Sequence, residues 1–132
     1  MREILFRGKR KDNGEWVYGS LLCHKGFSIF DECFKNWVSV EGKTVGQYTG
    51  LTDNNGEKIF EGDVFEHGGS TFCEPERFEV GYFDASFCHR NVTKQSKYWN
   101  SFADGEFGLC GEWCTVIGNI HDNPELLEVN KQ

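Results

Sequence analysis

Alternation of apolar and polar positions begins within the first residues of the chain and predicts a β-hairpin over residues 2–22. Side chains alternate along residues 4–7, and the chain returns through residues 16–22. Residues 12–14 between these arms read Asp-Asn-Gly, and an Asn-Gly pair tolerates the positive φ that a tight hairpin turn demands. The alternation and the turn chemistry therefore indicate the same element.

The middle stretch, residues 44–64, contains two chain reversals. Residues 53–56 read Asp-Asn-Asn-Gly, which predicts a hairpin loop with Gly56 in the left-handed conformation. A second reversal at Glu61-Gly62-Asp63 follows directly after the strand that leaves this loop. Two sharp turns so close together predict that the backbone changes sheets, with Gly50, Gly56 and Gly62 at the corners.

The remaining patterns are also typical of strands. Short apolar runs occupy residues 26–30 and 36–40, a strand pair around Asp84 is expected over residues 77–90, and an alternating strand over residues 111–120. Aromatic residues and an Asp-Gly turn mix over residues 97–110. The last expected element is a short helix, with Asn123 as N-cap and Pro124 at its first position.

Composition supports a mainly β protein. Twelve Phe, four Trp and four Tyr accompany sixteen Gly and a single Met among 132 residues, which favours strands and tight turns over packed helices. The length and the lack of a linker predict one domain over residues 1–132. We expect a cytoplasmic protein without a membrane segment, because no apolar run reaches about 18 residues and no secretory signal opens the chain.

Charge is distributed unevenly along the chain. The first eleven residues carry a formal +4 and the remaining residues −11, which gives the total of −7. A net negative surface repels phosphate backbones, so general binding to nucleic acid is disfavoured. The basic hairpin could still contact a nucleic acid, with Trp16 and Tyr18 as stacking platforms.

Catalytic and metal-binding patterns are weak. Cys110 and Cys114 have the spacing of half a zinc site, but a second close pair is missing, so we expect free thiols and no metal or cofactor. Neither Cys88 nor Cys114 lies in a nucleophile motif. Asp53 and Asp63 lie at hairpin ends, where carboxylates commonly form turns. The sequence therefore predicts no catalytic residue and no enzymatic activity.

Three stretches together resemble the YopX family of small proteins from phages and prophages. They read FRGKRKDNGEWVYGSL near the start, TVGQYTGLTDNNGEKIFEGDVF in the middle and VIGNIHDNPELL near the end. The resemblance implies a mostly β fold with a bent, SH3-like barrel or roll, in the cytoplasm of a bacterial host. It implies no activity and no catalytic residue. Residues 67–110 carry little of the family pattern.

These observations lead to two functional hypotheses. The first is a phage or prophage accessory protein that acts as a non-enzymatic, self-associating, protein-binding module. Its contact surface is expected at the polar-aromatic triplet Gln47, Tyr48 and Thr49, which could equally be a hydrogen-bonded core element, and at Trp16 and Tyr18. A host or phage protein is the expected partner. The second hypothesis is a nucleic-acid-associated module that uses the basic hairpin.

Overall fold

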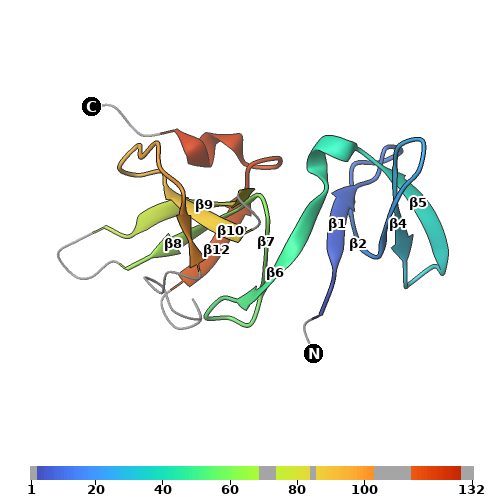
Figure 1. Cartoon of the computed structure of the whole chain (residues 1–132), viewed down its shortest axis with the longest axis horizontal. Helices are drawn as coiled ribbons and strands as arrows, with labels where there is room; N and C mark the ends of the chain where they lie inside the picture. Colours follow the sequence, from blue (N-terminus) through green and yellow to red (C-terminus); the bar gives the residue numbers. More distant parts are fainter. Residues whose placement is uncertain (1–2, 69–73, 84–85, 103–113, 129–132) are drawn as a thin grey trace. The chain divides into compact units, whose positions relative to one another are not determined.

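The computed structural model describes residues 3–68, 74–83, 86–102 and 114–128, and Figure 1 traces their strands. The chain divides into two compact units, Met1–Gly50 and Leu51–Gln132, which we call unit 1 and unit 2. Both units consist mainly of antiparallel strands. The prediction of a mainly β protein is therefore confirmed, whereas the single domain expected over residues 1–132 stays a prediction.

Unit 1 contains five complete strands and the start of a sixth. They are β1 (Phe6–Lys9), β2 (Trp16–Gly19), β3 (Leu21–Cys23), β4 (Phe27–Asp31), β5 (Asn36–Val40) and the first part of β6 (Gly46–Thr52), with the 3-10 turn η1 (Gly42–Thr44) before β6. β1 lies between β2 and β6, and β4 lies between β3 and β5. An isolated bridge between Arg10 and Val40 links the end of β1 to β5.

The core of unit 1 is a small aliphatic cluster. Val17, Ile29, Val38 and Val40 are buried together, and they come from β2, β4 and β5, where alternate residues face inward. Gly19 is required at the end of β2, because a Cβ atom there would lie 2.0 Å from the carbonyl oxygen of Phe30. The backbones of β2 and β4 thus approach too closely for any other residue.

Unit 2 contains the end of β6 and a larger sheet. Its elements are β7 (Lys58–Phe60), β8 (Asp63–His67), β9 (Glu76–Phe83), β10 (Ser86–Asn91), β11 (Asn100–Ser101), β12 (Cys114–Asn119) and the 3-10 turn η3 (Pro124–Leu127). The five-stranded sheet has the order β11-β10-β9-β8-β12. β7 pairs with β6, whereas β8 belongs to this sheet, so the predicted change of sheets between β7 and β8 is confirmed.

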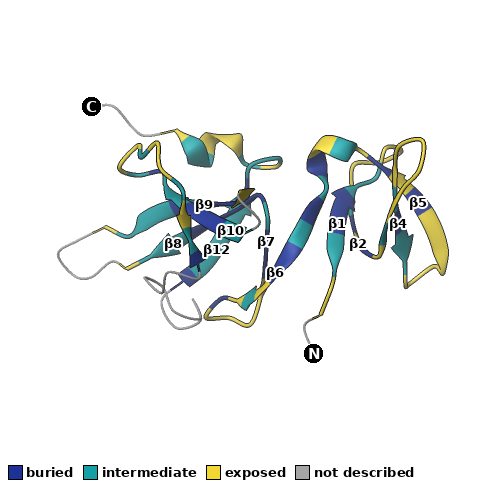
Figure 2. Cartoon of the chain, in the orientation of Figure 1, coloured by how far each residue is buried: buried dark blue, intermediate teal, exposed yellow. Residues whose placement is uncertain are grey.

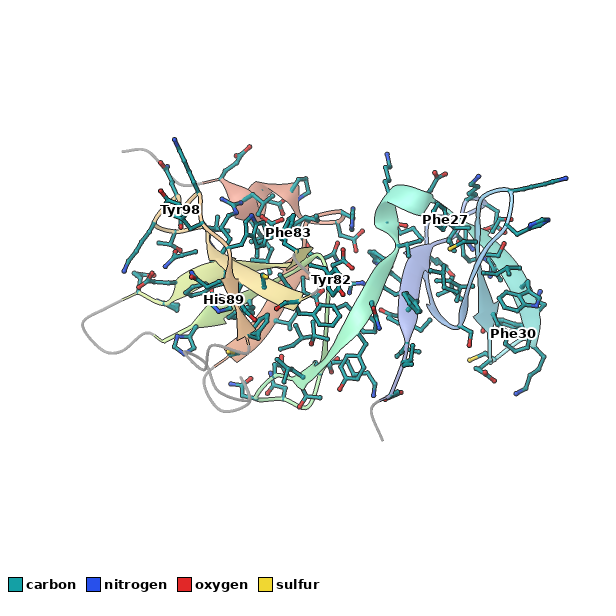
Figure 3. All side chains as sticks on the ribbon, in the orientation of Figure 1. Phe27, Phe30, Tyr82, Phe83, His89 and Tyr98 are labelled. Carbon is teal, nitrogen blue, oxygen red and sulfur yellow. The ribbon has the colours of Figure 1, made fainter. Side chains whose placement is uncertain are left out.

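Aromatic rings dominate the core of unit 2. Phe65 and Phe78 stack with their centroids 5.3 Å apart, and Phe102 lies 6.2 Å from Phe65. His89 is buried in the same region, with its ring 4.8 Å from that of Phe102, and Figure 3 labels it within the sheet. Large rings of this kind supply much buried apolar area in a unit of this size.

Two details of the predicted architecture, the SH3-like barrel and the C-terminal helix, are not confirmed. The described strands form open sheets and close no barrel. The expected C-terminal helix is only the four-residue 3-10 turn η3, and Asn123 stands at its N-cap without a side-chain capping bond. Its side-chain oxygen instead accepts a hydrogen bond from the backbone N–H of Asn119, at 3.3 Å. No helix in the described ranges is long and apolar enough to cross a membrane.

Candidate functional site

The structure separates the five residues expected at a contact surface. Tyr48 and Thr49 are buried and Gln47 is half-buried, and the backbone N–H of Tyr48 donates to the carbonyl oxygen of Leu5 at 2.8 Å. The triplet is therefore placed in the folded interior rather than on an open surface. Tyr18, in contrast, is 45% exposed.

Three exposed aromatic side chains define what we call the aromatic surface of unit 1. Tyr18 on β2 is joined by Phe34, which is 74% exposed in the turn between β4 and β5, and by Trp37 on β5, which is 50% exposed. Trp37 faces outward because Val38 and Val40 occupy the inward positions of the same strand. Figure 2 shows exposed residues along β5 and in the adjoining turns.

Two shallow grooves connect these side chains. One, of about 280 Å³, is lined by Trp16, Tyr18 and Phe34, and the other, of about 270 Å³, is lined by Trp37. Arg10 lines both grooves, so the two grooves adjoin at this side chain. Each lies just below the roughly 300–1,000 Å³ typical of small-molecule sites, and each has room for a single side chain of a partner protein.

Carboxylates surround the first groove. Glu15, Asp31 and Glu32 line it together with Arg10. Arg10 is held by Asp12, whose carboxylate accepts hydrogen bonds from its Nε at 3.0 Å and Nη2 at 2.9 Å. This contact lowers the pKa of the Asp12 carboxyl group and raises the pKa of Arg10. The charge of Arg10 is thus already matched within the chain.

Trp16 is engaged by two cations from the neighbouring strand. The Arg7 guanidinium lies 4.6 Å from the centroid of the Trp16 ring and the Lys9 ammonium group 5.6 Å from it. Because Lys9 is directly opposite Trp16 in the register of β1 and β2, these contacts follow from the hairpin itself. Trp16 is consequently half-buried and is not an open platform for stacking.

The tightly specified turn in the middle of the sequence is structural. Asp53 is buried, and its Oδ1 accepts hydrogen bonds from the backbone N–H groups of Asn55 and Glu57, both at 2.9 Å. Its Oδ2 accepts from the N–H of Val116 on β12, also at 2.9 Å. One carboxylate therefore shapes the hairpin loop and ties it to a strand 63 residues away.

Two further turns among the described residues of unit 2 are built in the same manner. Asp63 is buried and its Oδ2 accepts from the N–H of Phe60 at 2.7 Å, while the N–H of Gly62 donates to the carbonyl of Val80. Near the C-terminus, Oδ1 of Asn119 accepts from the N–H groups of His121 and Asp122, at 3.0 and 2.9 Å. These side chains replace missing backbone partners at turns.

The described cysteine and histidine side chains include no metal-binding cluster. Across the described ranges, no group of three or more His, Cys, Asp or Glu residues is arranged to hold a metal ion. Cys23, Cys33 and Cys88 are free thiols, whereas Cys114 is disulfide-bonded. The expectation of free thiols is therefore wrong at Cys114. Cys110, the other half of the considered zinc pair, lies outside the described residues.

Unit 2 carries exposed aromatic residues of its own. Tyr82, Phe83 and Tyr98, labelled in Figure 3, are 46%, 48% and 78% exposed. The Phe83 ring packs 4.8 Å from that of Trp99, and a Cβ atom on Gly81 would lie 2.8 Å from Trp99. Tyr82 likewise packs against Phe87, with the ring centroids 4.9 Å apart, so two of these three exposed rings have aromatic neighbours within unit 2.

Phe34, Trp37 and Asp31 were not singled out from the sequence, although two signals were present. Residues 36–40 read Asn-Trp-Val-Ser-Val, and a strand that buries both valines must turn the tryptophan outward. Phe34 stands among polar residues in a stretch that has to be a turn, so its ring had no inward position to take. The groove itself required the fold, because it joins β2 to the turn after β4.

This arrangement defines a small, mainly β protein whose unusual sequence stretches are hydrogen-bonded turns. The family model described as YopX protein matches residues 5–128, and the chain belongs to the YopX family. Among solved structures, protein EF1440 from Enterococcus faecalis is similar, with 24% identity, a TM-score of 0.63 and coverage of 97% of this chain and 100% of that chain. At that identity the likeness supports the fold alone. No curated protein matches the sequence.

Proposed function

We propose that this protein is a phage or prophage accessory protein, located in the bacterial cytoplasm, that acts as a non-enzymatic, self-associating, protein-binding module. The observation that carries the proposal is the aromatic surface of unit 1, where Tyr18, Phe34 and Trp37 are all exposed. Aromatic residues are enriched at protein interfaces, and soluble monomers rarely expose such a patch without a use for it.

The grooves add support for a protein partner. They are shallow, they lie between side chains of different strands and turns, and each is small enough to take one side chain. Such features match the pockets that anchor residues fill at the centre of an interface.

The nucleic-acid hypothesis receives less support. Trp16 is already covered by Arg7 and Lys9, and Arg10 is bound to Asp12. Glu15 and Asp31 line the groove beside Tyr18, and a phosphate backbone would be repelled by their charge.

Two finer parts of the proposal rest on the family resemblance. The SH3-like roll fits unit 1 best, because its β5 is bridged to the end of β1 through Arg10 and Val40. The cytoplasmic location is the one that the resemblance to phage and prophage proteins implies. A disulfide such as that of Cys114 is uncommon in a reducing cytoplasm, so cell fractionation is the appropriate test of location.

Self-association is tested by light scattering of the full chain over a range of concentrations. We expect a species larger than a monomer, and we expect Phe34→Ser together with Trp37→Ser to shift it toward the monomer. Tyr98→Ser is the matched control, because Tyr98 is exposed to a similar extent, 78% against 74% for Phe34. A strict monomer at all concentrations would remove the self-association claim.

Protein binding is tested by photo-crosslinking from position 34 in the infected host, with a crosslinker at position 98 as the control. We expect a discrete protein adduct from position 34 that is lost when Tyr18 and Trp37 are replaced by Ser. Adducts to nucleic acid from position 34, with no protein adduct, would move the nucleic-acid hypothesis ahead.

A further inference from the structure

We infer that the groove beside Tyr18 and Phe34 receives an arginine side chain from a basic segment of the partner protein. The inference rests on the proposed function, since it names the chemistry that the aromatic surface recognises. The groove combines aromatic side chains with carboxylates, and it has a volume of about 280 Å³.

Only some of the charged side chains that line the groove form ion pairs with other residues of the chain. Arg10 is bound to Asp12, and the Glu32 carboxylate contacts the Lys35 ammonium group at 3.2 Å. Within the described residues, the carboxylates of Glu15 and Asp31 form no salt bridge, and their charge acts on Arg10 only at longer range, where it helps to raise the pKa of Arg10.

Glu15 and Asp31 also retain unused acceptor oxygens. Only Oδ1 of Asp31 accepts a hydrogen bond within the described residues, from the N–H of Cys33 at 2.9 Å. The carboxylate of Glu15 accepts no hydrogen bond among the described residues. Its backbone N–H, in contrast, donates to Oδ1 of Asn13. The carboxylate oxygens of Glu15 and Asp31 could therefore accept hydrogen bonds from a cation that binds in the groove.

The aromatic side chains favour a guanidinium over other cations. Tyr18 and Phe34 are 45% and 74% exposed, so both can present ring surface to a planar cation. A guanidinium stacks on aromatic faces and donates paired hydrogen bonds to carboxylates, whereas an ammonium group is a compact and strongly hydrated charge. Phosphate is disfavoured by Glu15 and Asp31, because its charge has the same sign as theirs.

The test uses the full chain, labelled with nitrogen-15, and Nα-acetyl-arginine amide as the probe. We expect the backbone amide signals of residues 15–18 and 31–34 to shift, with a Kd on the order of millimolar, because each contact is exposed and individually weak. Nα-acetyl-citrulline amide has nearly the same shape without the charge, and it should bind at least about fivefold more weakly. Raising the salt to about 0.5 M should weaken the arginine response.

Conservative variants assign the response to the groove. Glu15→Gln and Asp31→Asn should each weaken arginine binding about threefold, and Phe34→Ser by a similar factor. Asp31→Asn keeps a side-chain oxygen for the N–H of Cys33, so the turn is preserved. Glu57→Gln, at an exposed carboxylate of unit 2, is the matched control and should leave binding unchanged.

Several results would overturn the inference. Equal binding of the arginine and citrulline probes would remove the charge argument, and equal effects of Glu57→Gln and Asp31→Asn would indicate non-specific attraction to an acidic protein. Shifts at residues 15–18 and 31–34 that follow protein concentration, without response to the probe, would mean that a second copy covers the groove. Shifts with a thymidine oligonucleotide but not with arginine would assign the groove to nucleic acid.

Failure of the inference is distinguishable from failure of the proposed function. If replacing Tyr18 and Trp37 by Ser abolishes the protein adduct from position 34 while arginine does not bind, the protein-binding function stands and the groove recognises another side chain. If arginine binds but no protein adduct forms, the groove chemistry stands and the wider function fails.

Discussion

The turn after β4 in unit 1 and the turn after β6 in unit 2 both join antiparallel strands, and both begin with an aspartate that accepts backbone hydrogen bonds. Asp31 accepts one, from the N–H of Cys33, and Phe34 in the same turn is left exposed. Asp53 accepts three, one of them from Val116 on a distant strand. The same local chemistry therefore produces an open turn in one unit and a buried, cross-linked turn in the other.

The two units also differ in charge. Residues 1–50 contain eight Lys and Arg against six Asp and Glu, a net charge of +2, whereas residues 51–132 contain six against fifteen, a net charge of −9. The aspartate and asparagine side chains of the turns in unit 2 accept hydrogen bonds from the backbone of the same unit. The comparison teaches that the most tightly specified residues hold the fold, while the proposed contact surface consists of residues whose pattern is ordinary.

Replacing the two aspartates should give the largest difference between the units. Asp53→Ala leaves three backbone N–H groups without their charged acceptor, and we expect it to lower the free energy of unfolding by about 3 kcal/mol or more. Asp31→Ala removes one exposed hydrogen bond and should cost about 1 kcal/mol or less. Urea unfolding followed by tryptophan fluorescence measures both. Similar costs would mean that the link between Asp53 and Val116 contributes nothing.

Substitutions at two glycines distinguish the cost of a steric clash from the cost of a strained backbone conformation. Gly19→Ala in unit 1 places a Cβ atom 2.0 Å from the carbonyl oxygen of Phe30, and we expect a loss of about 2–3 kcal/mol because backbone cannot easily move aside. Gly56→Ala in unit 2 meets no neighbour within 4 Å, but φ is +78° there, so we expect about 1 kcal/mol. Thermal melts rank the two variants, and the opposite order would contradict this account of Gly19.

Exposed aromatic residues should matter little for folding. Phe34→Ser is expected to change the free energy of unfolding by no more than about 0.5 kcal/mol, because its side chain is 74% exposed. Trp37→Ser should cost about 1 kcal/mol, because the half-exposed ring also packs edge-on against Phe30 at 5.3 Å. The same chemical denaturation experiment measures this, with Tyr98→Ser as the control in unit 2. A loss above about 2 kcal/mol would show that these rings are structural and would weaken the case for a contact surface.

The smallest effect on stability is expected from the ion pair between Arg10 and Asp12. Hydrogen bonding to Arg10 depresses the pKa of Asp12 below its ordinary value of 3.8, and Arg10→Gln should raise it toward that value. Carbon-detected NMR titration of the Asp12 carboxyl group measures the change. A depressed pKa gives stability that is present above the unfolded value and lost as the pH falls through the folded one, but this exposed pair should leave the unfolding midpoint unchanged.

Much of the local structure could be predicted from the sequence. The hairpin turn at residues 12–14, the loop ending at Gly56 and the reversal at Gly62 were all recognised, and the three glycines at positions 14, 56 and 62 have positive φ. Turn chemistry acts over a few residues, so it can be read without knowing the fold. Of the residues expected at a contact surface, Tyr18 is exposed whereas Tyr48 is buried, and local pattern could not distinguish the two.

The sequence by itself determined the mainly β character, the positions of the sharp turns and the uneven charge, since these depend on alternation, glycine and residue counts. Only the tertiary structure decided which turns are buried, that Asp53 reaches Val116, and that Arg10 lies between two grooves. The physical reason is that burial and hydrogen bonds between distant segments depend on how strands pair. That pairing joins residues that no local pattern connects.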